Sequence, residues 1–83
     1  MKGGYIMTVY VIIHGVDYEG EEYIGVYSTM EKAKNKIAEI LKEDLEWNHV
    51  TEQQVKEWLR TKDNTFDLSG ESYYIFTEVV DNN

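Results

Sequence analysis

The side chains of this 83-residue chain that could do chemistry gather in one short stretch near its beginning. His14 is followed closely by Asp17, Glu19, Glu21 and Glu22. A histidine beside carboxylates can coordinate a divalent metal ion or act in general acid–base catalysis. However, the spacing matches no metal motif, and an EF-hand loop would need a Gly at its sixth position and a Glu at its twelfth. The simpler interpretation is a solvated hairpin tip, and we expect no metal site there.

The rest of the sequence offers little else for catalysis. It contains no cysteine, no glycine-rich phosphate loop, no serine nucleophile elbow and no His-Glu-x-x-His motif. Ser28 and Ser69 have no base at a known spacing, and His49 is expected to cap or pack between two helices. We therefore expect a protein that is not an enzyme, without catalytic residues or a cofactor.

Acidic and basic residues are unevenly distributed along the chain. The formal net charge is −8, yet seven of the eight bases lie between Lys32 and Lys62, where the net charge is +1. The remaining residues carry −9. A field of this sign repels nucleic acid and anionic lipid and attracts basic surfaces, although acidity can also serve solubility alone. No apolar run is long enough to span a membrane and no signal peptide is present, so we expect a cytoplasmic protein that binds neither nucleic acid nor membrane.

The elements that must position these residues follow from residue type and periodicity. Residues 7–14, 23–27 and 72–80 are rich in β-branched and aromatic side chains and predict three strands. Apolar residues recur at helical spacing over residues 30–45 and 55–59, and Trp47 and Trp58 are expected in the core. Ser28 with Glu31, and Thr51 with Gln54, have the spacing of capping boxes at the two helix starts. Residues 62–71 read as a loop.

These elements predict one α+β domain over residues 1–83, with the order ββααβ. The expected sheet has three mainly antiparallel strands with the helices packed on one face. Residues 7–80 would form the folded core and residues 81–83 a polar tail.

The predicted strands are apolar on both faces, which two short helices cannot cover. Val9, Val11 and Ile13 alternate with Tyr10, Ile12 and His14, and alternation alone does not say which set faces the helices. An uncovered apolar patch commonly marks a contact surface, and tyrosine suits such a surface because its ring is amphipathic. The side chains that we predict there are Tyr10, Ile12, His14, Tyr23, Tyr27 and Tyr73, with an acidic rim of Glu19, Glu21, Glu22, Asp63 and Asp67.

The opening Met-Lys-Gly-Gly-Tyr-Ile-Met has no evident structural role in the sequence. Lys-Gly-Gly can be encoded by a purine run that contains a bacterial ribosome-binding site, and the next two codons would supply the spacer before Met7. We therefore interpret residues 1–6 as a translated leader and Met7 as the native start. This hypothesis points to a low-GC Gram-positive bacterium or its phage.

Three strings carry a family resemblance: VYVIIHGVDYEG, EYIGVYSTMEKAKNKI and YYIFTEVVD. Together they resemble a family of small bacterial and phage proteins that begin where Met7 stands here. The resemblance covers residues 9–37 and 73–81, and the longer middle at residues 45–69 departs from the shared plan. It implies a small α+β domain and brings no activity that could be carried over.

Three functions remain open from the sequence, the least favoured being a small-molecule or metal binder that uses His14 and the hairpin acids. The first is a non-enzymatic, acidic protein-binding module, in its sharpest form a phage-encoded inhibitor whose carboxylates occupy the basic groove of a host defence or nucleic-acid-binding protein. The alternative is a homodimeric accessory or regulatory domain without a defence role.

Overall fold

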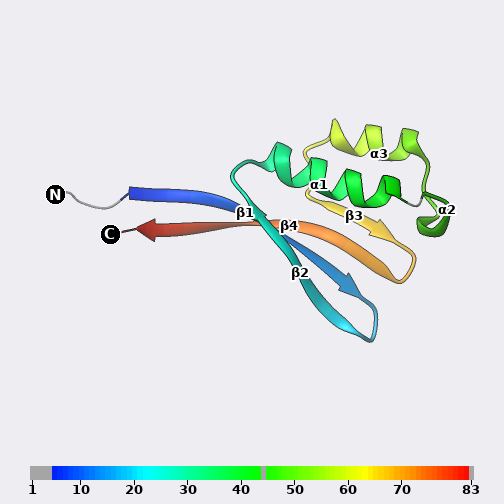
Figure 1. The fold of residues 1–83 in the computed structure, drawn as a ribbon, viewed down its shortest axis with the longest axis horizontal. Helices are drawn as coiled ribbons and strands as arrows, with labels where there is room; N and C mark the ends of the chain where they lie inside the picture. The colour runs from blue at the N-terminus through cyan, green and yellow to red at the C-terminus, as the bar shows by residue number, and fades with distance from the viewer. Residues whose placement is uncertain (1–4, 44, 83) are drawn as a thin grey trace.

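The structure, a computed structural model, describes residues 5–43 and 45–82. Within them the chain forms a four-stranded antiparallel sheet and three helices (Figure 1). In chain order these elements are β1 (Tyr5–Val16), β2 (Gly20–Tyr27), α1 (Met30–Glu43), α2 (Leu45–Asn48), α3 (Glu52–Leu59), β3 (Thr65–Leu68) and β4 (Glu71–Asn82).

The predicted α+β class is confirmed, but the three-stranded ββααβ plan is wrong. The segment at residues 62–71, predicted to be a loop, contains the additional strand β3, and the short helix α2 lies between the two predicted helices. β3 is a four-residue edge strand joined to β4 through Ser69 and Gly70, and Gly70 has a φ of +82°. The Ser-Gly dipeptide is a turn signal, but the strand before it is only four residues long, and the sequence therefore did not predict this hairpin.

The strand order is β2-β1-β4-β3, so the first and last strands of the chain lie side by side in the middle of the sheet. β1 and β4 pair along their whole described length, from Tyr5 opposite Asn82 to Val16 opposite Glu71. Asp81 and Asn82, which the sequence predicts as part of a polar tail, belong to β4. Of the proposed leader, Tyr5 and Ile6 are paired residues of β1, and residues 1–4 lie outside the described part.

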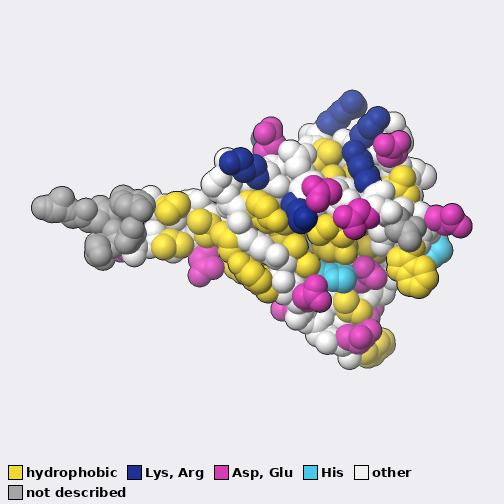
Figure 2. All heavy atoms as spheres, viewed as in Figure 1, with side chains coloured by type: hydrophobic (Ala, Val, Ile, Leu, Met, Phe, Trp, Pro, Cys, Tyr) yellow, Lys and Arg dark blue, Asp and Glu magenta, His cyan; other side chains and the backbone are white. Residues whose placement is uncertain are grey.

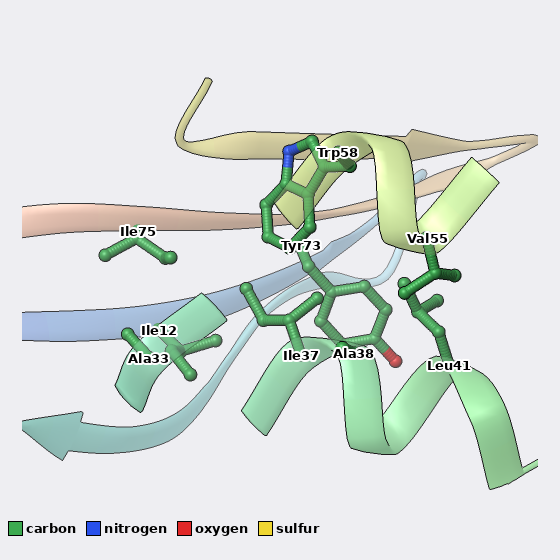
Figure 3. Close-up of a cluster of buried hydrophobic side chains, with 9 residues drawn as sticks. All are labelled: Ile12, Ala33, Ile37, Ala38, Leu41, Val55, Trp58, Tyr73 and Ile75. Carbon is green, nitrogen blue, oxygen red and sulfur yellow. The ribbon is translucent and has the colours of Figure 1, made fainter. Parts of the chain in front are cut away.

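The hydrophobic core lies between the sheet and helices α1 and α3 (Figure 3). Ile12 and Ile75 are directly opposite each other on β1 and β4, and both are fully buried. The predicted apolar stripe of α1 is confirmed, because it supplies Ile37 and Leu41 to this cluster. Other buried members are Ala33, Ala38, Val55, Trp58 and Tyr73.

The two predicted capping boxes have different outcomes. Thr51 and Gln54 form both reciprocal hydrogen bonds at the start of α3, as predicted. At α1 the hydroxyl that accepts the backbone N–H of Lys32 belongs to Thr29, so the helix begins one residue later than the Ser28 box would require.

The two tryptophans also differ. Trp58 is buried and its indole N–H donates to the Thr65 carbonyl at 2.8 Å, which ties α3 to β3. Trp47, also expected in the core, is 77% exposed because the short helix α2 lies at the margin of the helical layer.

Candidate protein-interaction surface

The helices cover one face of the sheet and leave the other uncovered. Directly opposite residues of antiparallel strands share a face, so the registers assign each strand residue to a side. Val11, which is itself buried, lies opposite both Val26 and Phe76, and none of these three residues belongs to the cluster under the helices. We call this side the uncovered face, formed by Met7, Val9, Val11, Ile13, Tyr23, Val26, Tyr74, Phe76 and Val80.

Exposed apolar side chains are concentrated on the uncovered face. Among the described residues, nine large hydrophobic side chains are exposed, and five of them lie on this face. Five such side chains on one sheet face differ from scattered surface hydrophobics, which are common on any protein and require no explanation. The five are Met7, Tyr23, Val26, Phe76 and Val80.

The structure thus places most of the predicted contact residues on the opposite side. Ile12 and Tyr73 are buried beneath the helices, so their predicted exposure is wrong. Tyr10 and Tyr27 are partly buried and pack against the same core. Of the predicted aromatic contacts, only Tyr23 lies on the uncovered face, where it is 62% exposed.

The sequence did contain a signal for the correct side. Along β4, Phe76 and Val80 alternate with Ile75 and Val79, so hydrophobicity alone does not separate the two sets. Glu78 belongs to the first set, and a carboxylate is rarely buried without a partner. The position of Glu78 therefore predicts that the sheet face bearing Phe76 is exposed to solvent, and this is the face that the helices do not cover.

His14 is part of a cluster on the helix side, at the hairpin end of β1. Its Nε2 lies 2.9 Å from Glu71 Oε1, and its ring stacks on Tyr73 with 4.3 Å between centroids. Glu22 is its direct neighbour on β2. Burial raises the pKa of Tyr73 above its ordinary value, and the carboxylates of Glu71 and Glu22 raise it further. The cluster holds a half-buried histidine in one orientation, and its contacts are internal to the fold.

The predicted acidic rim is distributed over several places. Glu21 is on the uncovered face, where its carboxylate accepts the hydroxyl hydrogen of Tyr74. This hydrogen bond raises the pKa of Tyr74. Asp67 shares that face on the edge strand β3, and Glu19 is exposed in the β1–β2 turn.

Two predicted rim residues have other positions. Glu22 faces the helix side beside His14. Asp63 follows α3, and its Oδ1 accepts the backbone N–H of Thr65 at 3.0 Å, which stabilises the turn into β3. These two carboxylates therefore do not border the uncovered face.

Charge separates the sheet from the helical layer. The four strands contain no Lys or Arg, and their acidic residues are Glu21, Glu22, Asp67, Glu71, Glu78 and Asp81. In Figure 2 the Lys and Arg side chains lie over the helices. The uncovered face is therefore an apolar surface with carboxylates and no cation in its strands.

The described residues contain no group of three or more His, Asp or Glu arranged to hold a metal ion. No helix in this part of the chain has the length and apolar character needed to cross a membrane.

Comparison with known proteins identifies the family. No curated protein and no solved structure matches the chain. A family model described as a domain of unknown function, DUF7336, matches residues 7–68, from β1 through β3. This agrees with the resemblance to a family that brings no activity with it, while the string pattern on which the resemblance rested stays a prediction. Because the matched segment covers well over half of the sequence, the chain belongs to the DUF7336 family.

Proposed function

We propose that this protein is a non-enzymatic protein-binding module that contacts its partner through the uncovered face. The observation that carries this proposal is the placement of five exposed apolar side chains on the one sheet face without helices. Burial of apolar area supplies most of the affinity in protein association, and Tyr and Phe are enriched in such contacts. Tyr23 and Phe76 are the aromatic side chains available here.

The charges on this side indicate the chemistry of the partner. Glu21, Asp67 and Glu78 share the uncovered face, and no Lys or Arg occurs in any strand. A complementary surface carries apolar side chains flanked by Lys or Arg, because opposite charges at the rim speed association and exclude wrong partners. An inhibitor that occupies a basic groove of a host protein is one form of this function, and that narrower identity stays a prediction.

Capture with matched variants tests the proposal. The full-length chain is immobilised, exposed to bacterial lysate, and compared with Phe76→Ser, Val26→Ser and the control Val79→Ser. Val79 is a similarly apolar, exposed residue of β4 on the helix side. A specific partner should be retained by the native chain and by Val79→Ser, and lost from the other two variants.

The captured protein is then purified, and its affinity for each chain is measured. We expect Phe76→Ser and Val26→Ser each to weaken binding about tenfold or more, the loss typical of a central apolar contact. We also expect affinity to fall as salt is raised, because the carboxylates contribute. Equal binding by all four chains would contradict the proposal, and so would the absence of any specific partner.

A further inference from the structure

One part of the sheet has only two strands. The pairing of β2 with β1 ends at Tyr10 opposite Tyr27, and β3 reaches only Tyr74 on β4. Residues 5–9 of β1 and 78–82 of β4 therefore pair with each other alone and extend away from the helices (Figure 1). We call these two segments the ribbon.

The ribbon exposes apolar side chains on both of its faces. Met7 and Val80 are opposite each other on one face and are 40% and 41% exposed. On the other face, Ile6 is 72% exposed and Val79 is 63% exposed. An isolated pair of strands is marginally stable in water, and a third strand or a covering helix normally stabilises it. Among residues 5–43 and 45–82, no further strand pairs with the ribbon.

The two free edges of the ribbon differ in how they are protected. The β4 edge carries Glu78 and Asp81, and acidic residues on an edge oppose pairing with another acidic chain. The β1 edge has the sequence Tyr-Ile-Met-Thr-Val, with no charge, no Pro and no Gly. The only register irregularity of β1 against β2 lies further along, between Ile12 and Ile13. Residues 5–9 therefore contain no charge, Pro, Gly or register shift, which are features that commonly block strand addition.

We infer that residues 5–9 of β1 pair antiparallel with the same residues of a second copy, forming a two-fold dimer centred near Met7. Antiparallel pairing of a strand with itself generates two-fold symmetry directly, which closes the assembly at two copies. No like charges meet across the edge, because residues 5–9 are uncharged. The two sheets would join into one of eight strands.

The second copy fits this edge better than the partner proposed above. A basic partner is attracted to carboxylates, and residues 5–9 contain none. Conversely, two copies stacked through their uncovered faces would bring Glu21, Asp67 and Glu78 of each copy toward those of the other. The edge is thus suited to self-association, and the face is suited to a different protein.

This geometry has a consequence for binding. The symmetry axis of an antiparallel edge pair stands perpendicular to the sheet, so both uncovered faces point to the same side. The dimer would then present two docking surfaces in one plane and could bind a repeated partner with increased avidity. The dimer itself does not depend on the proposed partner function.

Sedimentation equilibrium on the full chain tests this inference, with Met7→Lys and Val80→Lys as a matched pair. The two residues are equally exposed, share one face and are cross-strand neighbours, but they lie on different edges of the ribbon. The apparent mass of the native chain should rise with concentration from 9.8 kDa toward twice that value. Met7→Lys should raise the dissociation constant about tenfold or more, because two cations would be adjacent at the axis. Val80→Lys should dimerise like the native chain.

Each other outcome decides against the inference. A native chain that stays monomeric at high concentration contradicts it. Equally weakened dimerisation in both variants would indicate that two copies stack through their uncovered faces. Weakened dimerisation in Val80→Lys alone would indicate that the copies pair through the β4 edge. Salt gives an independent readout, because each copy has a net charge of −8 and screening should strengthen the dimer while weakening the basic partner's binding. Amide exchange at residues 6–9 should slow as the native chain is concentrated, and unchanged exchange would count against edge pairing.

Discussion

The ammonium of Lys34 lies 2.9 Å from the Trp58 carbonyl oxygen and 4.3 Å from the centre of the Trp58 ring. It also donates to the Thr61 carbonyl at 2.8 Å. Trp58 lies in the last turn of α3 and Thr61 follows two residues after its end, and a cation is favoured at the carboxyl end of a helix. Burial lowers the pKa of Lys34, and the nearby Asp63 carboxylate opposes this shift. The Lys34 side chain, from α1, therefore caps the carboxyl end of α3.

Replacing this ammonium should destabilise the fold. We expect Lys34→Met to lower the free energy of unfolding by about 2 kcal/mol, because it removes two charge-assisted hydrogen bonds and keeps the aliphatic stem. Lys36→Met is the control, since Lys36 forms an exposed pair with Glu39 whose loss should cost under about 0.5 kcal/mol. Urea unfolding of the three proteins gives the values. Equal stability of Lys34→Met and the native chain would rule out this capping role.

The residue after α2 offers a stabilising substitution. His49 has a φ of +57°, and the N–H groups of His49 and Val50 donate to the carbonyls of Glu46 and Leu45. This is the Schellman pattern, in which glycine is favoured at the left-handed position, and it agrees with the predicted capping role of His49. We expect His49→Gly to raise the free energy of unfolding by about 1 kcal/mol, since the left-handed conformation strains other side chains. His49→Ala should give no such gain, and thermal unfolding of both variants checks the difference.

Alkaline stability should depend on Tyr73. Its pKa is raised in the folded state, first by burial and then by Glu71 and Glu22, so the unfolded chain releases this proton at a lower pH. The free energy of unfolding should therefore fall as the pH rises above about 10, the ordinary value for tyrosine. Tyr73→Phe keeps the aromatic ring and removes the hydroxyl group that titrates. Its stability should fall less between pH 9 and 11 than that of the native chain, whereas parallel pH profiles would refute this assignment.

The two faces of the sheet should respond differently to truncation. Ile12 is fully buried under the helices, and Ile12→Ala should lower the free energy of unfolding by about 3 kcal/mol through lost contacts and a residual cavity. Val26, on the uncovered face, is 46% exposed, and Val26→Ala should cost under about 1 kcal/mol. Denaturant unfolding compares them directly. Similar losses would mean that the Val26 side is packed as tightly as the core.

Local patterns in the sequence were enough for the fold class, the helix stripe of α1, the capping box at Thr51 and the two-sided apolar character of the strands. These features depend on neighbours within a few residues, so spacing and residue type determine them. The same patterns predicted β1 only over residues 7–14. Residues 5, 6, 15 and 16 also belong to this strand because they pair with β4, which is far away in the sequence.

The tertiary structure decided which side of the sheet became a surface. Alternation gives two apolar sets on β1 and β4, and only the packing of α1 and α3 buried the set that contains Ile12, Tyr73 and Ile75. The strand order is likewise a long-range property, because it depends on which strand edges meet after the helices have reversed the chain. The chemistry first suggested by His14 and its neighbouring carboxylates was resolved in the same way: the fold turned His14 and Glu22 toward the helix side and left Glu21 on the uncovered face.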